Sequence, residues 1–395
     1  MRRIFIFLFI SILLLLRFSL STTRGMFQNG EIYNMFLAVN ESRVTILKVN
    51  NKYPLNNIYA RLFYKEDGRY KGYFMVEKLS QEDSFTFMEL KEIKSEKVKN
   101  NFIQAYLSNI FERASEDFSP SLKNMNKALF LGEDSLSKKT KNKIRYLGLS
   151  HIFAMSGFHI ALVFSIFYFI CSKIFEKKLI IEITSLFFLS IYYLGVKESP
   201  SFTRAYIMIV IYILGRLLYE KINAVKTLVA SAIISIFLKP NTIFSLSFQF
   251  SYLAMFAIVY FYPLIKKINI KKWKILDYIL FTLSIQIFLI PIQIFYFNTF
   301  PFLSILINIL ILPFASFYIT VVYIHLFLEN FYLSFILSPL VEWSYRIFEK
   351  IINFCSDIPN MSIHFYSKNV VYFYLIFFLS IYIIKKVMFK KGKKI

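Results

Sequence analysis

The stretch GLSHIFAMSGFHIALVF, residues 148–164, combines a long apolar run with polar side chains that a bilayer would surround. His151, Met155 and His159 are spaced four residues apart, so we predict that they share one helix face. A Ser-Gly pair lies beside that face, and small residues let membrane helices approach closely. Two interpretations fit this pattern. The histidines either bond to neighbouring helices in ordinary packing, or they line a hydrophilic path together with hydroxyl groups.

Composition places the chain among membrane proteins with several spans. It has 395 residues, of which 57% are hydrophobic and 19% aromatic, and its mean hydropathy is +0.53. Soluble domains are about 45–50% apolar, and several segments here approach the roughly 20 apolar residues that a spanning helix needs. We therefore predict a polytopic α-helical membrane protein. The two cysteines lack metal-ligand spacing and are expected to serve packing.

The formal net charge of +23 is unevenly distributed. Residues 26–148 hold 20 Lys or Arg and 15 Asp or Glu, so this region contributes 5 of the excess positive charges and the rest of the chain contributes 18. That remainder lies at the ends of apolar segments, which is the pattern that membrane orientation produces. A basic path for nucleic acid is the alternative, and charge alone does not favour it.

Apolar segments predict about ten spans. Residues 1–22 are predicted to be an uncleaved anchor that starts in the cytoplasm. The other spans are predicted near 151–170, 179–195, 203–219, 224–238, 244–264, 275–295, 302–327, 331–354 and 370–385. The cytoplasmic stretches then hold about 19 basic residues and the opposite side of the membrane half about 8, which places both termini in the cytoplasm. The segment 331–354 is amphipathic, so it either spans or lies in the interface.

Residues 26–98 have a different character. Short, partly alternating runs such as RVTILKVNN and GRYKGYFMVEKL predict about five strands and a small, OB-like extracytoplasmic domain. Residues 99–147 are predicted to be a polar helical connector, whose first helix ends at Pro120. Residues 148–388 form the predicted multi-span domain, and residues 389–395 form a basic cytoplasmic tail.

Polar residues and prolines interrupt the apolar runs. Arg204 follows a turn and either snorkels to the interface or contacts an anion. At the start of the span near 244–264, polar residues alternate with apolar ones: Ser245, Ser247, Gln249 and Ser251. This pattern predicts a non-helical start of the span. The alternative is a serine-rich packing seam. Broken helices are predicted near four prolines: Pro240, Pro291, Pro301 and Pro313.

Several motifs, in the right order, resemble the ComEC family of competence proteins. The opening motif of that family is similar to KALFLGEDSLSKKTKNKIRYLGLSHIFAMSGFHIALV. Later family elements are similar to ESPSFTRAYIMIVIYILGRLL, NTIFSLSFQFSYLAMFAIVYFYPL and LSIQIFLIPIQIFYFNTFPFLSILINILILPF. The resemblance covers about residues 125–320. It implies a channel in the bacterial inner membrane that passes one strand of incoming DNA into the cytoplasm during natural transformation.

The resemblance also implies site residues and partners. The motif residues would line or shape a wet passage for a polyanion: His151, Ser156, Gly157, His159, Arg204, Met208, Pro240, Gln249, Ser251, Asn308 and Pro313. An external DNA-receptor protein and a cytoplasmic helicase-like ATPase are implied as partners, because the chain has no Walker A pattern. Single-stranded DNA and membrane lipid are the other expected partners, and a homo-oligomer remains open.

The outer domain offers a candidate DNA-facing surface. Basic grooves with stacking aromatic rings bind single-stranded DNA, and such residues are interleaved here: Arg61, Tyr64, Lys65, Arg69, Tyr70 and Lys71. The alternative is an ordinary strand whose solvated side is basic.

One departure from the family is clear. Many members carry a C-terminal metallo-β-lactamase-like domain, which needs a cluster of His and Asp ligands. This chain has four histidines and no such cluster, so we predict no metal, no cofactor and no nuclease or other catalytic site.

Three rival functions remain. They are a transporter of a small solute or lipid, a non-transporting scaffold for competence factors, and an intramembrane serine hydrolase that pairs Ser156 with a histidine such as His325.

Overall fold

The computed structural model describes most of the chain. The described residues are 22–23, 27–40, 43–54, 57–62, 68–82, 85–98, 101–133, 135–153, 155–197, 199–218, 223–268, 273–297, 299–300, 304–358 and 363–364. The predicted N-terminal anchor, the predicted span near 370–385 and the basic tail lie outside them. The side chains of His151 and Asn308 also lie outside the description, although both residues belong to described helices.

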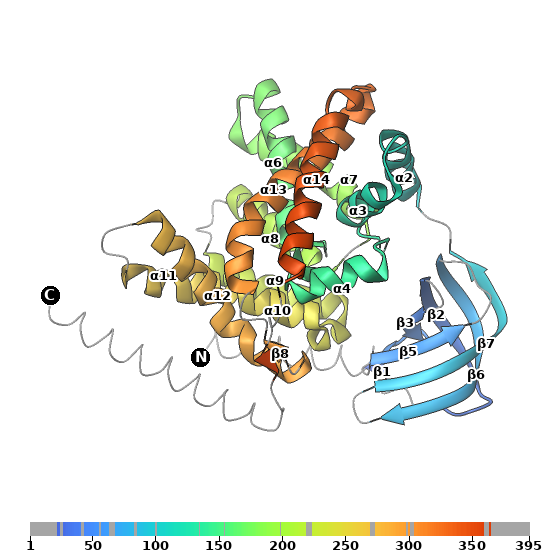
Figure 1. The fold of residues 1–395 in the computed structure, drawn as a ribbon. Helices are drawn as coiled ribbons and strands as arrows, with labels where there is room; N and C mark the ends of the chain where they lie inside the picture. Colours follow the sequence, from blue (N-terminus) through green and yellow to red (C-terminus); the bar gives the residue numbers. More distant parts are fainter. Residues whose placement is uncertain are drawn as a thin grey trace. The chain divides into compact units, whose positions relative to one another are not determined.

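The N-terminal region forms a closed five-stranded barrel (Figure 1). Its strands are β2 (Ile32–Asn40), β3 (Arg43–Val49), β5 (Asn57–Leu62), β6 (Gly68–Glu82) and β7 (Phe85–Lys97). Around the barrel they follow the order β2-β3-β5-β7-β6, and β6 closes back on β2. The β5–β7 pair is parallel, and the other neighbours are antiparallel. The short strands β1 (Thr22–Thr23) and β4 (Tyr53–Pro54) pair with each other. The predicted β-rich N-terminal region is therefore confirmed.

Strand alternation fills the barrel core. Met35, Leu37 and Val39 are fully buried, while the residues between them are partly exposed. A two-residue turn joins β3 to β4, where Asn50 and Asn51 both have positive φ values of 47° and 62°. Asparagine tolerates this conformation, and consecutive positive φ angles are typical of the turns that match strand twist.

Three helices form the connector between the barrel and the apolar helices. They are α2 (Phe102–Ala114), α3 (Pro120–Leu131) and α4 (Lys138–Tyr146). The prediction that Pro120 ends the first helix is wrong, because α2 already ends at Ala114 and Pro120 begins α3. Proline suits a first helical turn, where its missing N–H would have no partner in the helix. Gly132 ends α3 with a left-handed φ of 70°.

The rest of the described chain is helical, apart from two short paired strands, β8 (Thr299–Phe300) and β9 (Ile363–His364). The α-helices are α5 (Ser150–Phe153), α6 (Gly157–Ile174), α7 (Lys178–Gly195), α8 (Pro200–Leu217), α9 (Ala224–Leu238), α10 (Leu246–Phe256), α11 (Tyr262–Ile265), α12 (Lys274–Phe297), α13 (Ser304–Leu328) and α14 (Ser338–Ser356). Short 3₁₀ or π turns link them: η1 (Pro240–Phe244), η2 (Ala257–Phe261), η3 (Lys266–Ile268), η4 (Glu329–Phe331) and η5 (Ser334–Ile336).

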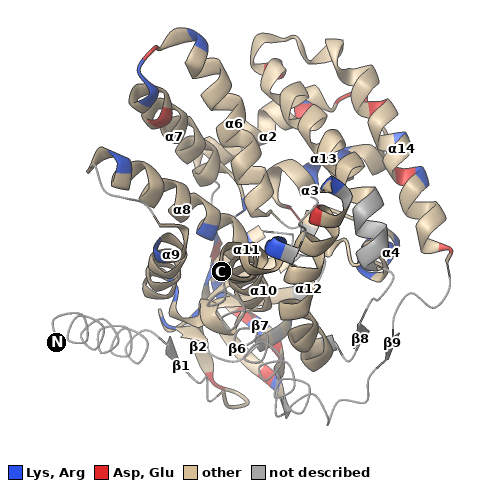
Figure 2. Ribbon diagram, turned by 90° about the vertical axis from the view of Figure 1, so that its left-hand side faces the viewer, with Lys and Arg blue, Asp and Glu red and all other residues tan. Residues whose placement is uncertain are grey.

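Five of these segments are long and apolar enough to cross a membrane. They are Gly157–Ile174, Lys178–Gly195, Leu246–Ile265, Leu276–Tyr296 and Ile311–Phe331. The helix α9 is apolar but shorter, and α8 and α14 are not among the five. Figure 2 shows little charge along α6 and α13, whereas α14 carries residues of both signs. The structure thus confirms a mostly helical protein with several candidate membrane spans. The total of about ten spans remains a prediction.

Two predicted interruptions are absent from the described helices. Pro291 and Pro313 lie inside α12 and α13, which continue through them. The predicted non-helical stretch from Ser245 to Ser251 is also wrong, because α10 is helical from Leu246 onward. The period-two pattern led to a wrong prediction because serine and glutamine occur on both faces of this apolar helix. A 3₁₀ turn that begins at Pro240 precedes it.

The helical part contributes to two compact units of the chain. One unit contains Met1–Ser135, Ala154–Gln249 and Leu326–Tyr332, and the other contains Leu136–Phe153, Phe250–His325 and Leu333–Ile395. In the second unit α14 packs antiparallel against α13. The ring of Phe348 stacks on that of Tyr318, with centroids 5.6 Å apart, and a short connection reverses the chain between the two helices.

In the first unit, α2 contacts the end of α13. The Arg113 guanidinium lies 3.2 Å from the Glu329 carboxylate, and the Tyr106 hydroxyl donates to Asn330 at 2.9 Å. The predicted topology places residues 99–147 outside and the turn after residue 327 in the cytoplasm. Those two placements are incompatible, because groups on opposite sides of a hydrocarbon core of about 30 Å cannot touch.

Candidate functional site

The opening motif contains a break between two helices. The helix α5 ends at Phe153 and α6 begins at Gly157, and Met155 and Ser156 between them are not helical. The prediction that His151, Met155 and His159 share one helix face is therefore wrong. Four-residue spacing places side chains together only where the helix is continuous.

Ser156 and His159 hold the start of α6. The backbone N–H of Ser156 donates to Nδ1 of His159 at 3.2 Å, and the Ser156 Oγ lies 2.9 Å from the same nitrogen. A backbone N–H can only donate, so Nδ1 must be the acceptor and the neutral imidazole carries its hydrogen on Nε2. His159 is 1% exposed. The pair thus satisfies a backbone donor at the helix start, as an N-terminal cap does.

Gly157 lets α8 approach the start of α6. A Cβ atom at Gly157 would lie 3.4 Å from the Cβ of Ala205 and 3.5 Å from Nη2 of Arg204. Arg204 is 6% exposed, and its Nη1 lies 3.6 Å from the sulfur of Met208 one turn further along α8. Four motif residues, Ser156, Gly157, His159 and Arg204, are thus brought to one place although Arg204 is distant in sequence.

A loop and a further glycine complete this arrangement. The Ser199 hydroxyl, at the N-cap of α8, donates to the carbonyl oxygen of Met155 in the break. A Cβ atom at Gly132 would lie 2.6 Å from Cγ of Met155 and 2.8 Å from the carbonyl oxygen of Lys197. We call Gly132, Met155, Ser156, Gly157, His159, Ser199 and Arg204 the helix-break cluster. Sequence reasoning missed Gly132 and Ser199, although each lies inside a quoted motif.

The other motif residues lie in different segments. Pro240 is buried at the start of η1, and the Gln249 amide donates to the Ile243 carbonyl oxygen at 3.2 Å. Ser251 is buried in α10, whereas Pro313 is exposed on α13. His151 belongs to α5 and Asn308 to α13, but their side chains lie outside the described residues.

Among the barrel residues predicted to face DNA, the described ones divide into an exposed group and a buried tyrosine. Arg61, Arg69 and Lys71 are exposed, and Tyr64 and Lys65 lie outside the described residues. Tyr70 is 5% exposed and belongs to the barrel core, so its predicted outward position is wrong. It alternates with Arg69 and Lys71 on one strand, and neighbouring strand residues point to opposite faces.

Acidic residues share the barrel surface with the basic ones. Lys78 lies 3.6 Å from Glu89, and Lys91 lies 4.0 Å from Glu77. The outer side of β6 and β7 therefore carries both signs of charge, and these exposed pairs contribute little to stability.

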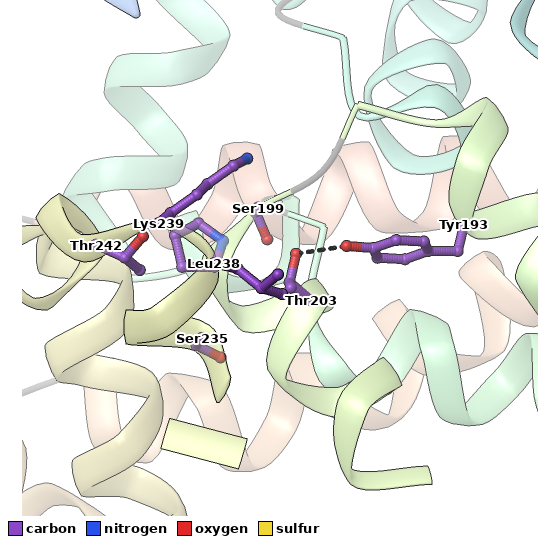
Figure 3. A pocket seen from close by; sticks show the side chains of 8 residues that line it. Tyr193, Ser199, Thr203, Ser235, Leu238, Lys239 and Thr242 are labelled. Carbon is purple, nitrogen blue, oxygen red and sulfur yellow. Dashed lines mark hydrogen bonds between the residues drawn. The ribbon is translucent and has the colours of Figure 1, made fainter. Parts of the chain in front are cut away.

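A small pocket lies next to the helix-break cluster, in the same unit (Figure 3). It has a volume of about 100 Å³ and is lined by Tyr193, Ser199, Pro200, Thr203, Ser235, Leu238, Lys239 and Thr242. Figure 3 shows Tyr193 and Thr203 on one side, joined by a hydrogen bond of 3.1 Å, and Lys239 and Thr242 on the other. Ser199 belongs to both the pocket and the cluster. No sequence pattern predicted this pocket, because its lining comes from α7, α8, α9 and η1.

Metal binding and serine hydrolysis each require a particular group of side chains. Within the described ranges, no group of three or more His, Cys, Asp or Glu side chains could hold a metal ion. Nδ1 of His325, the histidine considered for a serine dyad, lies 2.9 Å from the carbonyl oxygen of Ser334. The Ser156 hydroxyl instead contacts His159, in the capping arrangement described above.

Most of the helical part of the chain matches a known protein family. The family model described as "Competence protein" matches residues 129–389, which is about two thirds of the chain. The chain belongs to the competence protein family. The match includes the helix-break cluster and all the helices from α4 to α14, and the predicted resemblance is thereby confirmed.

Two relatives show how much of such proteins this chain covers. It is 25% identical over 171 residues to "ComE operon protein 3" of Bacillus subtilis, which is 43% of this chain and 22% of the relative. It is 25% identical over 248 residues to "Uncharacterized protein MG316 homolog" of Mycoplasma pneumoniae, which is 62% of this chain and 59% of the relative. The matched part is thus less than two thirds of either relative. No solved structure matches the chain.

Proposed function

We propose that the chain forms a path in the bacterial inner membrane through which one strand of DNA enters the cytoplasm during competence. The observation that carries this proposal is the helix-break cluster within a family-matched set of apolar helices. There Arg204 and His159 are both buried beside a broken helix. Ionisable side chains at membrane depth are costly and usually serve a pathway or a binding site. Non-helical backbone at that depth is tolerated where protein or a water-filled cavity receives its polar groups.

The barrel supports a nucleic-acid partner. Numbered along the barrel alone, its strands follow the order 1-2-3-5-4, with the parallel pair between the third and fifth strands. We propose that this closed Greek-key barrel is OB-like, a fold that often binds single strands. Arg61, Arg69 and Lys71 are exposed and are its candidate DNA contacts. An external DNA receptor and a cytoplasmic helicase-like ATPase are the proposed partners, and we propose that this chain has no catalytic site.

Uptake of labelled DNA tests the function. A competent bacterium lacking its own channel would express the full chain, and label protected from external nuclease would be counted in the cytoplasm. We expect the intact chain to restore uptake. Arg204→Gln is expected to reduce uptake at least tenfold, because it removes a buried cation from the cluster. Arg145→Gln is the matched control, since Arg145 is exposed on α4 and should leave uptake unchanged.

Two outcomes would contradict the proposal. If the intact chain is present in the membrane and uptake is not restored, the chain is not a DNA path in that host. A transporter of a small solute or lipid, or a scaffold, would then account for the fold better. If Arg204→Gln and Arg145→Gln reduce uptake equally, with equal protein levels, the helix-break cluster is not the part that matters.

A further inference from the structure

The start of the helix α2 is held at the end of a candidate span. The side chain of Asn101, the N-cap residue of α2, donates to the carbonyl oxygen of Leu194 at 3.0 Å. A Cβ atom at Gly195 would lie 2.8 Å from Cγ2 of Ile103, so this close approach depends on glycine. Leu194 and Gly195 are the last two residues of the span Lys178–Gly195. The first turn of α2 therefore lies at the depth where that span leaves the membrane.

The rest of α2 meets the end of a second span. Arg113 pairs with Glu329, and the Tyr106 hydroxyl donates to Asn330, in the contacts described above. Glu329 and Asn330 lie at the end of the span Ile311–Phe331. With 13 residues, α2 is about 20 Å long, which is shorter than a hydrocarbon core of about 30 Å. Both of its ends are thus held at one surface of the membrane, and the helix lies along that surface.

Exposed aromatic side chains follow one flank of α2 and continue onto the neighbouring turn. Phe102 is 84% exposed, and Tyr106, on the same face one turn later, is 49% exposed. Phe331 and Tyr332, at the end of η4, are 60% and 70% exposed. We call these four residues the aromatic stripe. Aromatic rings are enriched where a bilayer meets water, and this is the depth at which the two span ends place the stripe.

The charged side chains of α2 bind other parts of the protein. Arg113 pairs with Glu329, and Glu112 pairs with Lys123 and Lys127 on the side of α2 that faces α3. Burial of apolar and aromatic surface, more than attraction to anionic headgroups, is therefore what the stripe offers to lipid.

We propose that α2 is an in-plane anchor whose aromatic stripe inserts into the headgroup region of the phospholipid bilayer. The opposite side of α2 packs on protein through Leu107, Ile110 and Phe111, so the helix joins the span ends to the lipid surface. The last barrel strand, β7, ends at Lys97, and the five residue steps from there to Phe102 extend at most about 18 Å. The anchor thus keeps the end of β7 close to the membrane. This inference does not depend on the proposed transport of DNA.

Tryptophan fluorescence measures the depth of the stripe. Trp273 and Trp343, the two tryptophans of the chain, would be replaced by phenylalanine, and Phe102→Trp or Tyr106→Trp would then be introduced into the full chain. Each protein would be placed in phosphatidylcholine nanodiscs with ordinary or brominated acyl chains. Interfacial helices bury their apolar side about 5–10 Å into the boundary between headgroups and acyl chains, so we expect bromine near the headgroup to quench about half of the emission. Bromine near the end of the acyl chain should quench less.

A tryptophan on the neighbouring helix provides the matched control. Asn124 is exposed on α3, which lies on the Glu112 side of α2, and Asn124→Trp should be quenched little by either lipid. If the tryptophans at positions 102 and 106 are quenched no more than this control, the proposal is overturned. Blue-shifted emission without quenching would give the stripe to another protein segment, and emission as in water would leave it in solvent. Because the nanodiscs contain no DNA, a failure of DNA uptake and a failure of the anchor are distinguishable.

Tyr332→Trp tests whether α2 lies in the plane of the membrane. Arg113 joins the end of α2 to Tyr332, while Phe102 begins the helix. An in-plane helix places both positions at one depth, so we expect the same ratio of shallow to deep quenching for Tyr332→Trp and Phe102→Trp. Deep quenching at one position and shallow quenching at the other would show that α2 crosses the bilayer obliquely, and would overturn the in-plane anchor.

Discussion

Gly132 and Gly157 lie on two sides of the helix break and tolerate different changes. A Cβ at Gly157 meets its neighbours at 3.4–3.5 Å, which is ordinary contact. At Gly132 the positive φ of 70° and contacts of 2.6 and 2.8 Å leave no room for one. We expect Gly157→Ala to be nearly neutral, whereas Gly132→Ala should lower the free energy of unfolding by about 2 kcal/mol through strain and overpacking.

Thermal unfolding of the two variants in the same detergent measures this difference. Gly157→Leu extends the series, because its longer side chain must displace Arg204 or Ala205 and should destabilise the fold by about 1–3 kcal/mol. Equal unfolding temperatures for Gly132→Ala and Gly157→Ala would show that the two close approaches are not as described.

His159 acts at the residue scale as an acceptor for the backbone of Ser156. His159→Leu leaves that partly buried N–H without its partner and is expected to cost about 1–3 kcal/mol. His159→Asn keeps an acceptor near the position of Nδ1 and should retain part of this stability. Hydrogen exchange at the Ser156 amide provides the readout, with faster exchange expected in the leucine variant than in the asparagine variant. The same rate in both would exclude the capping role.

At the scale of elements, one cluster of charges ties α2 to α3. Lys123 Nζ lies 2.6 Å from Glu112, and Lys127 lies 3.6 Å from it. The hydrogen bond from Lys123 lowers the pKa of Glu112 below its ordinary value of 4.5, against the opposing effect of burial. A lowered pKa means that the ionised carboxylate stabilises the folded state above the unfolded pKa. That contribution is lost as the pH falls through the folded pKa.

We therefore expect the intact chain to be slightly more stable than Glu112→Gln at pH 6. The difference should disappear as the pH falls through the lowered pKa of Glu112, and it should shrink in high salt because Glu112 is exposed. Unfolding temperatures measured between pH 3 and 6 for both proteins test the sign. A difference that grows toward acid pH would contradict the assignment.

The helix α14 has three stripes. One is buried and includes Val341, Tyr345 and Phe348. A second is exposed and apolar, with Trp343 56% and Phe354 75% exposed. The third is polar: Glu342, Arg346, Glu349, Lys350 and Asn353. A helix that packs antiparallel on an apolar span and still carries a polar stripe is expected to face both lipid and water.

Single cysteines along α14 test this arrangement. Replacements of Glu342 and Asn353, near opposite ends of the polar stripe, should react with a water-soluble thiol reagent, while those of Trp343 and Phe354 should not. Because α14 runs antiparallel to α13, we expect an impermeant reagent to reach Glu342→Cys and Asn353→Cys from opposite sides of the membrane. Labelling of both from one side would instead show an interfacial helix.

At the scale of the whole molecule, the contact between α2 and the end of α13 constrains the topology. Arg113 lies against both Glu329 and Tyr332, the latter with its guanidinium 5.1 Å from the ring centroid. Glu116 follows α2 and is exposed, and Tyr332 is 70% exposed. We expect cysteines at these two positions to be labelled from the same side of the membrane. Labelling from opposite sides would favour the alternating topology predicted from charge.

Local patterns determined much of this protein. Apolar runs indicated the helices, and the punctuated alternation of residues 26–98 indicated strands, because burial on one face imposes a period on the sequence. The quoted motifs also identified the family and most of the helix-break cluster. Strand alternation alone could have assigned Tyr70 to the barrel interior, since Arg69 and Lys71 flank it.

Only the tertiary structure decided which residues meet. Ser199 reaches Met155 across 44 positions, Arg204 lies against Gly157, and the pocket lining comes from four separate segments. No periodicity encodes these contacts, because they depend on the packing of one helix on another and not on the conformation of either alone. The break between α5 and α6 could not be predicted from the sequence for a related reason. A capped helix start and the interior of a helix have similar apolar composition, and the neighbouring α3 and α8 decide between them.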